Sequence, residues 1–182
     1  MADVLIVGDG PGGLSAALFL AKNAMDVTVF GQDTTPVHKA MFYNYLGIPK
    51  MTGSEFQKIS REQVKSFGAE IRDVKVSATE KTEGGFAVTT VEGDRHEGKY
   101  LVLATGTNVQ LAQSLGLTKG ADGLEVDRDG RTSVGGLYAL GWSTRLKKTQ
   151  AIISAGQGAA TALDILSTET GEAGFHDFDV VE

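Results

Sequence analysis

The chain opens with an apolar run that breaks into a glycine-rich turn. Residues 4–7 read Val-Leu-Ile-Val, which is typical of a buried parallel strand. The spacing GxGxxG follows, carried by Gly8, Gly10 and Gly13. The first glycine permits a tight turn, the second lets the backbone approach a pyrophosphate, and the third lets helix and strand pack closely. With a helix expected over residues 13–23, the pattern predicts a dinucleotide site, the alternative being a glycine turn that serves packing alone.

A second strand, predicted over residues 26–30, completes a βαβ unit with the first strand and helix. In dinucleotide folds an acidic side chain at the end of this strand accepts hydrogen bonds from the adenosine ribose. Gln32 and Asp33 are the candidates, although Asp33 follows Gly8 at a somewhat longer spacing than usual. A solvated turn carboxylate is the alternative role for Asp33.

The rest of the chain predicts a mixed α/β fold with a parallel sheet and a small antiparallel β-meander. An aromatic-rich, irregular stretch over residues 37–53 precedes a helix in which Ser54 and Gln57 form a capping box. Gly68 ends that helix. The further elements are predicted in this order: helix 54–67, meander strands 74–79, 86–91 and 95–97, buried strands 100–104 and 137–140, and helix 152–166.

Composition excludes several classes of function. The chain has 182 residues, with 17 Lys and Arg against 23 Asp and Glu, and its net charge of −6 argues against a nucleic-acid partner. It has no cysteine, so within it no disulfide, thiolate nucleophile or dithiol relay can form, and any electrons must be carried by a bound group. No apolar run approaches the ~20 residues of a membrane span. We expect no secretory signal, no metal site and a cytoplasmic location.

We predict one domain over residues 1–170 and an acidic tail over residues 171–182. The tail contains no Lys or Arg and carries the acidic residues Glu172, Asp177, Asp179 and Glu182. Such a segment is typical of a solvated end of the chain, and a contact with a partner is the alternative.

Five segments carry motifs that are specific in combination. They are residues 8–13 (GDGPGG), 44–49 (NYLGIP), 103–106 (LATG), 131–139 (RTSVGGLYA) and 149–160 (TQAIISAGQGAA). Together they resemble the FAD domain of the thioredoxin reductase-like flavoproteins, the pyridine nucleotide-disulphide oxidoreductases. The resemblance covers nearly the whole chain and implies a Rossmann-like FAD-binding domain.

The resemblance also implies where FAD would lie. At the adenosine half it places Gly8, Gly10, Pro11 and Gly13 under the pyrophosphate, Gln32 or Asp33 near the ribose, and the backbone of Val76 at the adenine. At the flavin half it places Asn44 beside the isoalloxazine, and Thr149, Gln150 and Ala151 at the pyrimidine edge. Further contacts with the cofactor are implied for Thr105, Gly106, Gly141 and Trp142. A helix N-terminus at the pyrimidine edge would stabilise the negative charge of reduced flavin. The alternatives are a turn-forming role for Asn44 and an ordinary helix-start role for Gln150.

The chain departs from the family pattern at two side chains. Trp142 follows Gly141 where the family has an Asp that hydrogen-bonds the ribitol and a phosphate, and the loss of one such contact costs about 1–3 kcal/mol. Trp142 could instead stack on the flavin or fill a subunit interface. Asp9 puts a negative charge beside the pyrophosphate, so we expect its side chain to point into solvent.

The largest departure lies between Gly106 and Arg131. Family reductases insert there a complete NADPH domain with a Cys-x-x-Cys pair, and this chain has neither. The resemblance therefore implies a minimal single-domain FAD-binding oxidoreductase, not a self-sufficient thioredoxin reductase, that exchanges electrons with an external donor such as NAD(P)H or ferredoxin. The alternative is a non-catalytic nucleotide-binding or regulatory module.

Two further questions concern catalysis and assembly. No general acid or base stands out; His38 and Lys39 lie in the candidate loop, with solvated loop positions as the alternative. A homodimer is expected, because an FAD domain without its partner domain exposes apolar surface.

Overall fold

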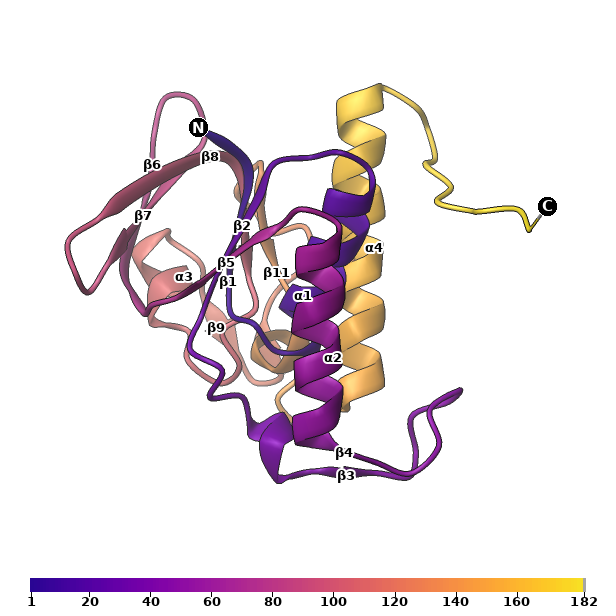
Figure 1. Ribbon diagram of the computed structural model, residues 1–182. Helices are drawn as coiled ribbons and strands as arrows, with labels where there is room; N and C mark the ends of the chain where they lie inside the picture. Colours follow the sequence, from indigo (N-terminus) through magenta and orange to yellow (C-terminus); the bar gives the residue numbers. More distant parts are fainter. Residues whose placement is uncertain (182) are drawn as a thin grey trace.

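The computed structural model describes residues 1–181, and its elements surround one mostly parallel sheet (Figure 1). In chain order the elements are β1 (Ala2–Val7), α1 (Pro11–Lys22), β2 (Val27–Gly31), η1 (Pro36–Lys39), β3 (Met41–Phe42), β4 (Met51–Thr52), α2 (Gly53–Ser66), β5 (Glu70–Asp73), β6 (Val76–Lys81), β7 (Phe86–Thr90), β8 (Arg95–Leu103), α3 (Gln110–Ser114), β9 (Lys119–Gly120), β10 (Gly123–Leu124), β11 (Leu137–Ala139), η2 (Gly141–Thr144) and α4 (Ala151–Thr170). This confirms the predicted α/β class with a parallel sheet and an antiparallel meander.

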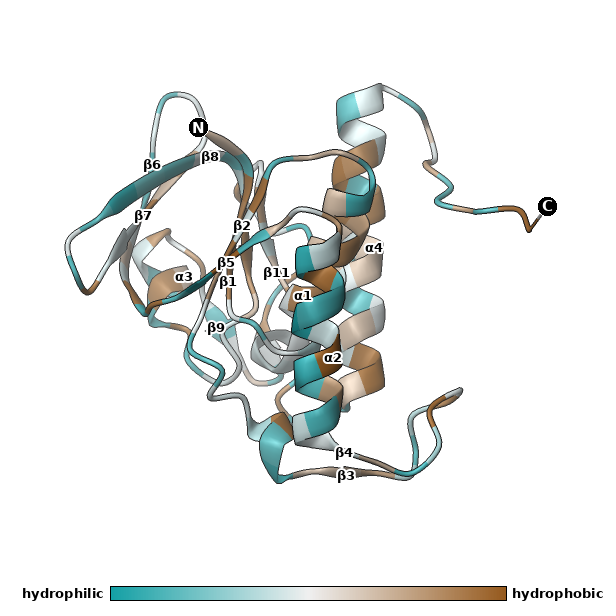
Figure 2. Ribbon diagram, viewed as in Figure 1, coloured by the Kyte–Doolittle hydropathy of each residue, from teal (hydrophilic) through white to brown (hydrophobic). Residues whose placement is uncertain are grey.

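The sheet has the strand order β5-β2-β1-β8-β7-β6, with β11 paired to the far part of β8. β1 runs parallel to β2 and β8, so its apolar residues are covered on both faces. Helices α1, α2 and α4 form a layer on one face, and α3 lies with the meander on the other (Figure 1). Val4 and Ile6 belong to the core on the helical side, whereas Leu5 and Val7 belong to the core on the opposite side. Figure 2 shows the apolar run of β1 inside the molecule.

β8 is one continuous strand where two separate strands were expected, over residues 95–97 and 100–104. Its first half pairs antiparallel with β7, from Thr89↔Arg95 to Phe86↔Gly98. Its second half pairs parallel with β1 and β11. Gly98 lies at the change of partner, and a Cβ there would come within 2.7 Å of Leu5 Cγ. One strand therefore joins the meander to the parallel sheet.

The start of α2 differs from the prediction. Thr52, not Ser54, is the N-cap, because its hydroxyl accepts the Glu55 N–H at 3.2 Å while Glu55 accepts the Thr52 N–H at 3.1 Å. The buried face of this helix is mostly polar. Gln57 and Arg61 are buried together with Val64, whereas Ile59 is 50% exposed. Figure 2 shows α2 as largely hydrophilic on its visible face.

Several short elements lie outside the predicted ones, among them β5 and the pair of β3 and β4. β5 extends the sheet by pairing parallel with β2, from Thr28↔Glu70 to Gly31↔Asp73. β3 and β4 form a small antiparallel pair, and the loop between them extends away from the sheet and the helical layer (Figure 1). The stretch predicted as irregular, residues 37–53, therefore contains a hairpin.

Helices α1 and α4 pack closely because small residues face each other. A Cβ at Gly158 would lie 2.1 Å from the Gly12 carbonyl oxygen, so only glycine allows this approach. Ala16 and Ala162 are fully buried in the same core. The resulting contact fixes the start of α1 beside the first turns of α4.

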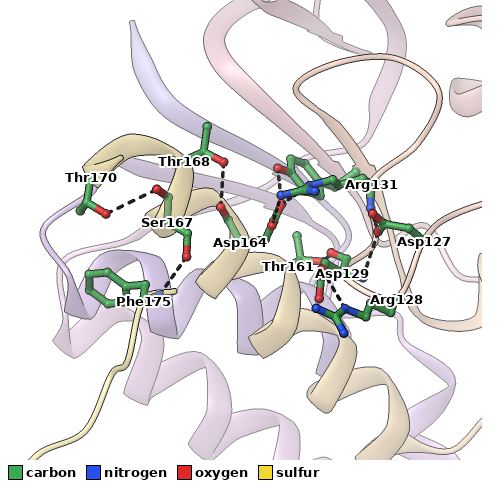
Figure 3. Close-up of polar contacts among 11 residues, drawn as sticks. Asp127, Arg128, Asp129, Arg131, Thr161, Asp164, Ser167, Thr168, Thr170 and Phe175 are labelled. Atoms are coloured by element: carbon green, nitrogen blue, oxygen red, sulfur yellow. Dashed lines mark hydrogen bonds and ion pairs between the residues drawn. The ribbon is translucent and has the colours of Figure 1, made fainter. Parts of the chain in front are cut away.

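The segment after α4 returns toward α1. Gly171 ends α4 in the left-handed conformation, with φ of 72°. Lys22 pairs with Asp177 and Asp179, and the Phe175 N–H donates to Ser167 Oγ at 2.9 Å (Figure 3 shows the latter). Of the predicted acidic tail, Glu182 lies outside the described residues. Among residues 1–181, none of the helices combines the length and the apolar character that crossing a bilayer requires.

Candidate functional site

A cleft of about 460 Å³ lies at the carboxyl ends of β1, β2 and β8. The connections from β1 diverge here, toward β2 on one side and β8 on the other, and such switch points are where open α/β sheets bind ligands. The size is within the range of small-molecule sites. Most residues predicted for the cofactor line it: Gly8, Gly10, Pro11, Gln32, Val76, Thr105, Gly106, Gly141, Trp142, Thr149, Gln150 and Ala151.

Three predicted residues lie outside the lining. Gly13 packs against the turn, since a Cβ there would meet the Gly8 carbonyl oxygen at 1.9 Å. Asn44 is exposed in the loop between β3 and β4, which extends away from the sheet. Asp33 has a left-handed backbone, with φ of 51°, and its carboxylate contacts His38 Nε2 at 2.9 Å.

The glycine turn has the geometry that close approach of a ligand requires. Gly8 has φ of 111°, and a Cβ there would lie 2.2 Å from the Ala104 carbonyl oxygen, so this position admits glycine only. A Cβ at Gly10 would meet nothing closer than Thr35 Oγ1 at 3.4 Å. The backbone at Gly10 is therefore open toward the cleft.

Two helix N-termini meet at the cleft. α1 begins after the N-cap Gly10 and α4 after the N-cap Gln150, and both N-caps line the cleft. Neither helix has a side-chain cap hydrogen bond or an acidic residue in its first turn. Their free N–H groups and positive dipole ends favour negative charge. The open glycine turn and these two termini fit the FAD that the resemblance implies, with a pyrophosphate at α1 and the flavin at α4.

Asp9, in the middle of the glycine turn, does not point into solvent as expected. It is 5% exposed, and its Oδ2 forms an ion pair with Arg61 on α2. The same oxygen accepts the Asp33 N–H at 3.1 Å, and Gln57 Nε2 donates to the Asp9 carbonyl oxygen at 2.7 Å. The expectation failed because a carboxylate can be buried when a cation and hydrogen bonds compensate for its lost hydration.

Arg61 links this turn to the edge of the sheet. Its guanidinium also pairs with Asp73 at the end of β5. Burial lowers the pKa of Arg61, but the hydrogen bond to Asp73 and the charges of Asp9 and Asp73 outweigh it, so the net shift is upward. Gln57, Arg61 and Asp73 were not among the predicted site residues. The available signal was the spacing of Gln57, Arg61 and Val64, which places the three on one face of α2.

Trp142 lines the cleft in the 3₁₀ turn that follows β11. It is 37% exposed, and its indole N–H donates to the Leu146 carbonyl oxygen at 3.4 Å. Gly141, with φ of 74°, donates its N–H to Gln157 Oε1 at 3.0 Å. Gln157 was also missed; through Gly141 and Thr144 it ties the turn that carries Trp142 to α4.

The two loop residues weighed for catalysis, His38 and Lys39, do not line the cleft. His38 Nδ1 contacts Ser54 Oγ at 3.0 Å on the opposite side of the ring from Asp33. Within residues 1–181 no group of three or more acidic or histidine side chains is arranged to hold a metal ion.

Comparisons with known proteins match the chain to one family model and to parts of several reductases. The family model described as pyridine nucleotide-disulphide oxidoreductase matches residues 2–109 and 45–159. The thioredoxin reductase of Aquifex aeolicus is 37% identical over 108 residues, which are 57% of this chain and 33% of that protein. Ferredoxin–NADP reductase 3 of Lysinibacillus sphaericus is 30% identical over 165 residues, which are 79% of this chain and 47% of that protein. The chain thus spans a third to about half the length of these relatives.

A solved structure has the same fold. The atypical thioredoxin reductase of Desulfovibrio vulgaris Hildenborough superposes with a TM-score of 0.86 at 19% identity, over 96% of this chain and 100% of that chain. At this identity the similarity concerns the fold alone.

Proposed function

The chain belongs to the pyridine nucleotide-disulphide oxidoreductase family, whose cofactor is FAD, and from this premise we propose that it is an FAD-binding unit that exchanges electrons with an external donor or partner. The observation that carries the proposal is the meeting of two uncapped helix N-termini at a cleft bordered by the glycine turn. When bound, FAD would carry the electrons, because the chain has no cysteine pair that could carry them.

The chain's own residues have separable tasks in this proposal. Gly8 and Gly10 would leave room for the pyrophosphate at the start of α1, and Val76 would line the adenine end. Gln150 and Ala151 would present the N-terminus of α4 to the flavin pyrimidine edge, where negative charge is stabilised. We also propose that Trp142 borders the flavin end of the cleft.

The electron donor is proposed from the relatives. Curated relatives include proteins named thioredoxin reductase and ferredoxin–NADP reductase. Because this chain has no cysteine and spans only part of those proteins, we propose that the electrons come from an external donor, NAD(P)H or a reduced ferredoxin. We also propose that the protein is cytoplasmic and forms a homodimer. We propose one domain over residues 1–170.

An absorbance experiment tests the proposal. Purified protein incubated with FAD and then freed of excess cofactor is expected to keep the bands of oxidised flavin. Under anaerobic conditions, NADH, NADPH and reduced ferredoxin are then added separately, and bleaching identifies the donor. A protein that remains colourless after incubation with FAD contradicts cofactor binding; a coloured protein that none of the three bleaches contradicts the proposed donors.

A second candidate is a non-catalytic nucleotide-binding module. Trp142 favours this function, because it stands where the family has an acidic side chain that contacts the cofactor. Its indole N–H already donates a hydrogen bond to the Leu146 carbonyl oxygen. This function predicts nucleotide binding without turnover. Steady oxidation of NAD(P)H with any electron acceptor would contradict it.

A further inference from the structure

We propose that Asp9 supplies the carboxylate that binds the adenosine ribose hydroxyls, a role that dinucleotide folds ordinarily give to the end of the second strand. The inference rests on the proposed nucleotide binding and assigns the residue that selects a free ribose.

Space at the end of β2 is occupied by Asp9. Gly31 is the last residue of β2, and a Cβ built on it would lie 2.2 Å from Asp9 Cγ and 2.5 Å from Asp9 Oδ1. A side chain at position 31 and the Asp9 carboxylate are therefore mutually exclusive. The glycine at the strand end admits an acid that comes from the glycine turn.

The residues near the strand end provide no other carboxylate to the cleft. Gln32 lines the cleft but is uncharged, and Asp33 does not line it. The Asp33 carboxylate faces His38, while its N–H is bound to Asp9. Asp9 does line the cleft, and its carboxylate lies against Gly31 at the end of β2.

One oxygen of Asp9 is left for a ligand. Within residues 1–181, the side-chain hydrogen bonds of Asp9 all use Oδ2, which receives Arg61 and the Asp33 N–H, and none uses Oδ1. Arg61 is held in turn by Asp73. The carboxylate is thus fixed in orientation by protein donors and presents Oδ1 as a free acceptor.

This chemistry selects among nucleotides. A carboxylate accepts hydrogen bonds from the 2′- and 3′-hydroxyls of a ribose, and it repels a phosphate attached at either position. The cleft would therefore take adenosine diphosphate groups with an unmodified ribose, such as that of FAD. It would bind 2′-phosphorylated or 2′-deoxy forms more weakly.

Calorimetric titration of flavin-free protein with ADP and with 2′-deoxy-ADP tests the assignment. We expect 2′-deoxy-ADP to bind the unaltered protein at least about tenfold more weakly, since a hydrogen bond to a charged acceptor is lost. In Asp9→Ala the two ligands should bind within about twofold of each other. Asp33→Asn should keep the tenfold preference, because the Asp33 carboxylate is turned toward His38.

The outcomes separate the two proposals. Equal binding of ADP and 2′-deoxy-ADP to the unaltered protein overturns the ribose assignment while nucleotide binding stands. Loss of the preference in Asp33→Asn but not in Asp9→Ala assigns the ribose to Asp33 and overturns it as well. If Asp9→Ala does not fold, judged by circular dichroism, the unaltered protein and Asp33→Asn still decide. Failure of both FAD and ADP to bind overturns the proposed function itself.

Discussion

The hydroxyl of Tyr138 donates a hydrogen bond to Asp164 Oδ2 at 2.8 Å, which joins β11 to the middle of α4. Arg131 Nε donates to the same oxygen at 2.7 Å (Figure 3). One carboxylate on α4 thus holds both the last strand and the loop before it. Since α4 begins at the cleft, this network also sets where its N-terminus lies.

The first prediction concerns alkaline pH. Burial, then the hydrogen bond to Asp164 and its charge, raise the pKa of Tyr138 above its ordinary value, although Arg131 opposes them. A raised folded-state pKa means that the contribution to stability is complete below the unfolded pKa of about 10 and is lost as pH rises above it. Tyr138→Phe should therefore show a shallower fall in the free energy of unfolding between pH 9 and 11, measured by urea denaturation. The exposed Tyr43→Phe is the control and should leave the slope unchanged.

The second prediction concerns the buried ion pair in the glycine turn. Arg61→Met should destabilise the protein by about 3–5 kcal/mol, because it leaves the Asp9 carboxylate buried without its cation. Arg72→Met removes an exposed pair with Glu70 and should cost no more than about 1 kcal/mol. Urea denaturation near neutral pH compares the two variants. Equal losses would contradict the importance assigned to the pair with Asp9.

A third prediction uses two glycines on the same helix. Gly158→Ala should destabilise by about 1–3 kcal/mol, because its Cβ would overlap the Gly12 carbonyl oxygen. Gly156→Ala meets nothing within 4 Å and should stabilise by up to about 1 kcal/mol through higher helix propensity. Thermal unfolding should thus give opposite shifts. A stable Gly158→Ala protein would mean that α1 and α4 pack less closely than described.

A fourth prediction uses the single tryptophan as a reporter. Trp142 lines the cleft, so titration with FAD should quench its fluorescence in a saturable manner. ADP, which lacks the flavin, should quench it much less if Trp142 borders the flavin end. Trp142→Phe removes the signal and supplies the blank. Strong quenching by ADP would place Trp142 at the adenine end instead.

Local patterns in the sequence predicted much of the fold. The apolar residues 4–7 and the glycines that follow indicate a buried strand and a turn without knowledge of the rest of the chain, and the structure has both. β5 was missed because it is a short edge strand, Glu-Ile-Arg-Asp, whose half-exposed residues lack an apolar signature. The continuity of β8 was missed because its middle residues, such as Lys99, are charged and exposed.

The candidate site was predictable only in part, for a different reason. The glycines could be placed because their backbone geometry is local. The direction of Asp9 depends on Arg61, which lies on another element and was predicted merely as part of a helix. Gln57 and Arg61 are polar residues in a hydrophilic helix, so their burial becomes evident only when α2 packs on the glycine turn.

The short hairpin of β9 and β10 has a practical consequence. These strands pair antiparallel, with Gly120 opposite Gly123, so the chain leaves and re-enters the body of the molecule at one point. The two ends of any polypeptide spliced between the exposed residues Ala121 and Asp122 would be held about 5 Å apart. A folded domain with neighbouring termini could therefore be inserted at this position while β9 and β10 stay paired, so the hairpin is a suitable site for fusion proteins.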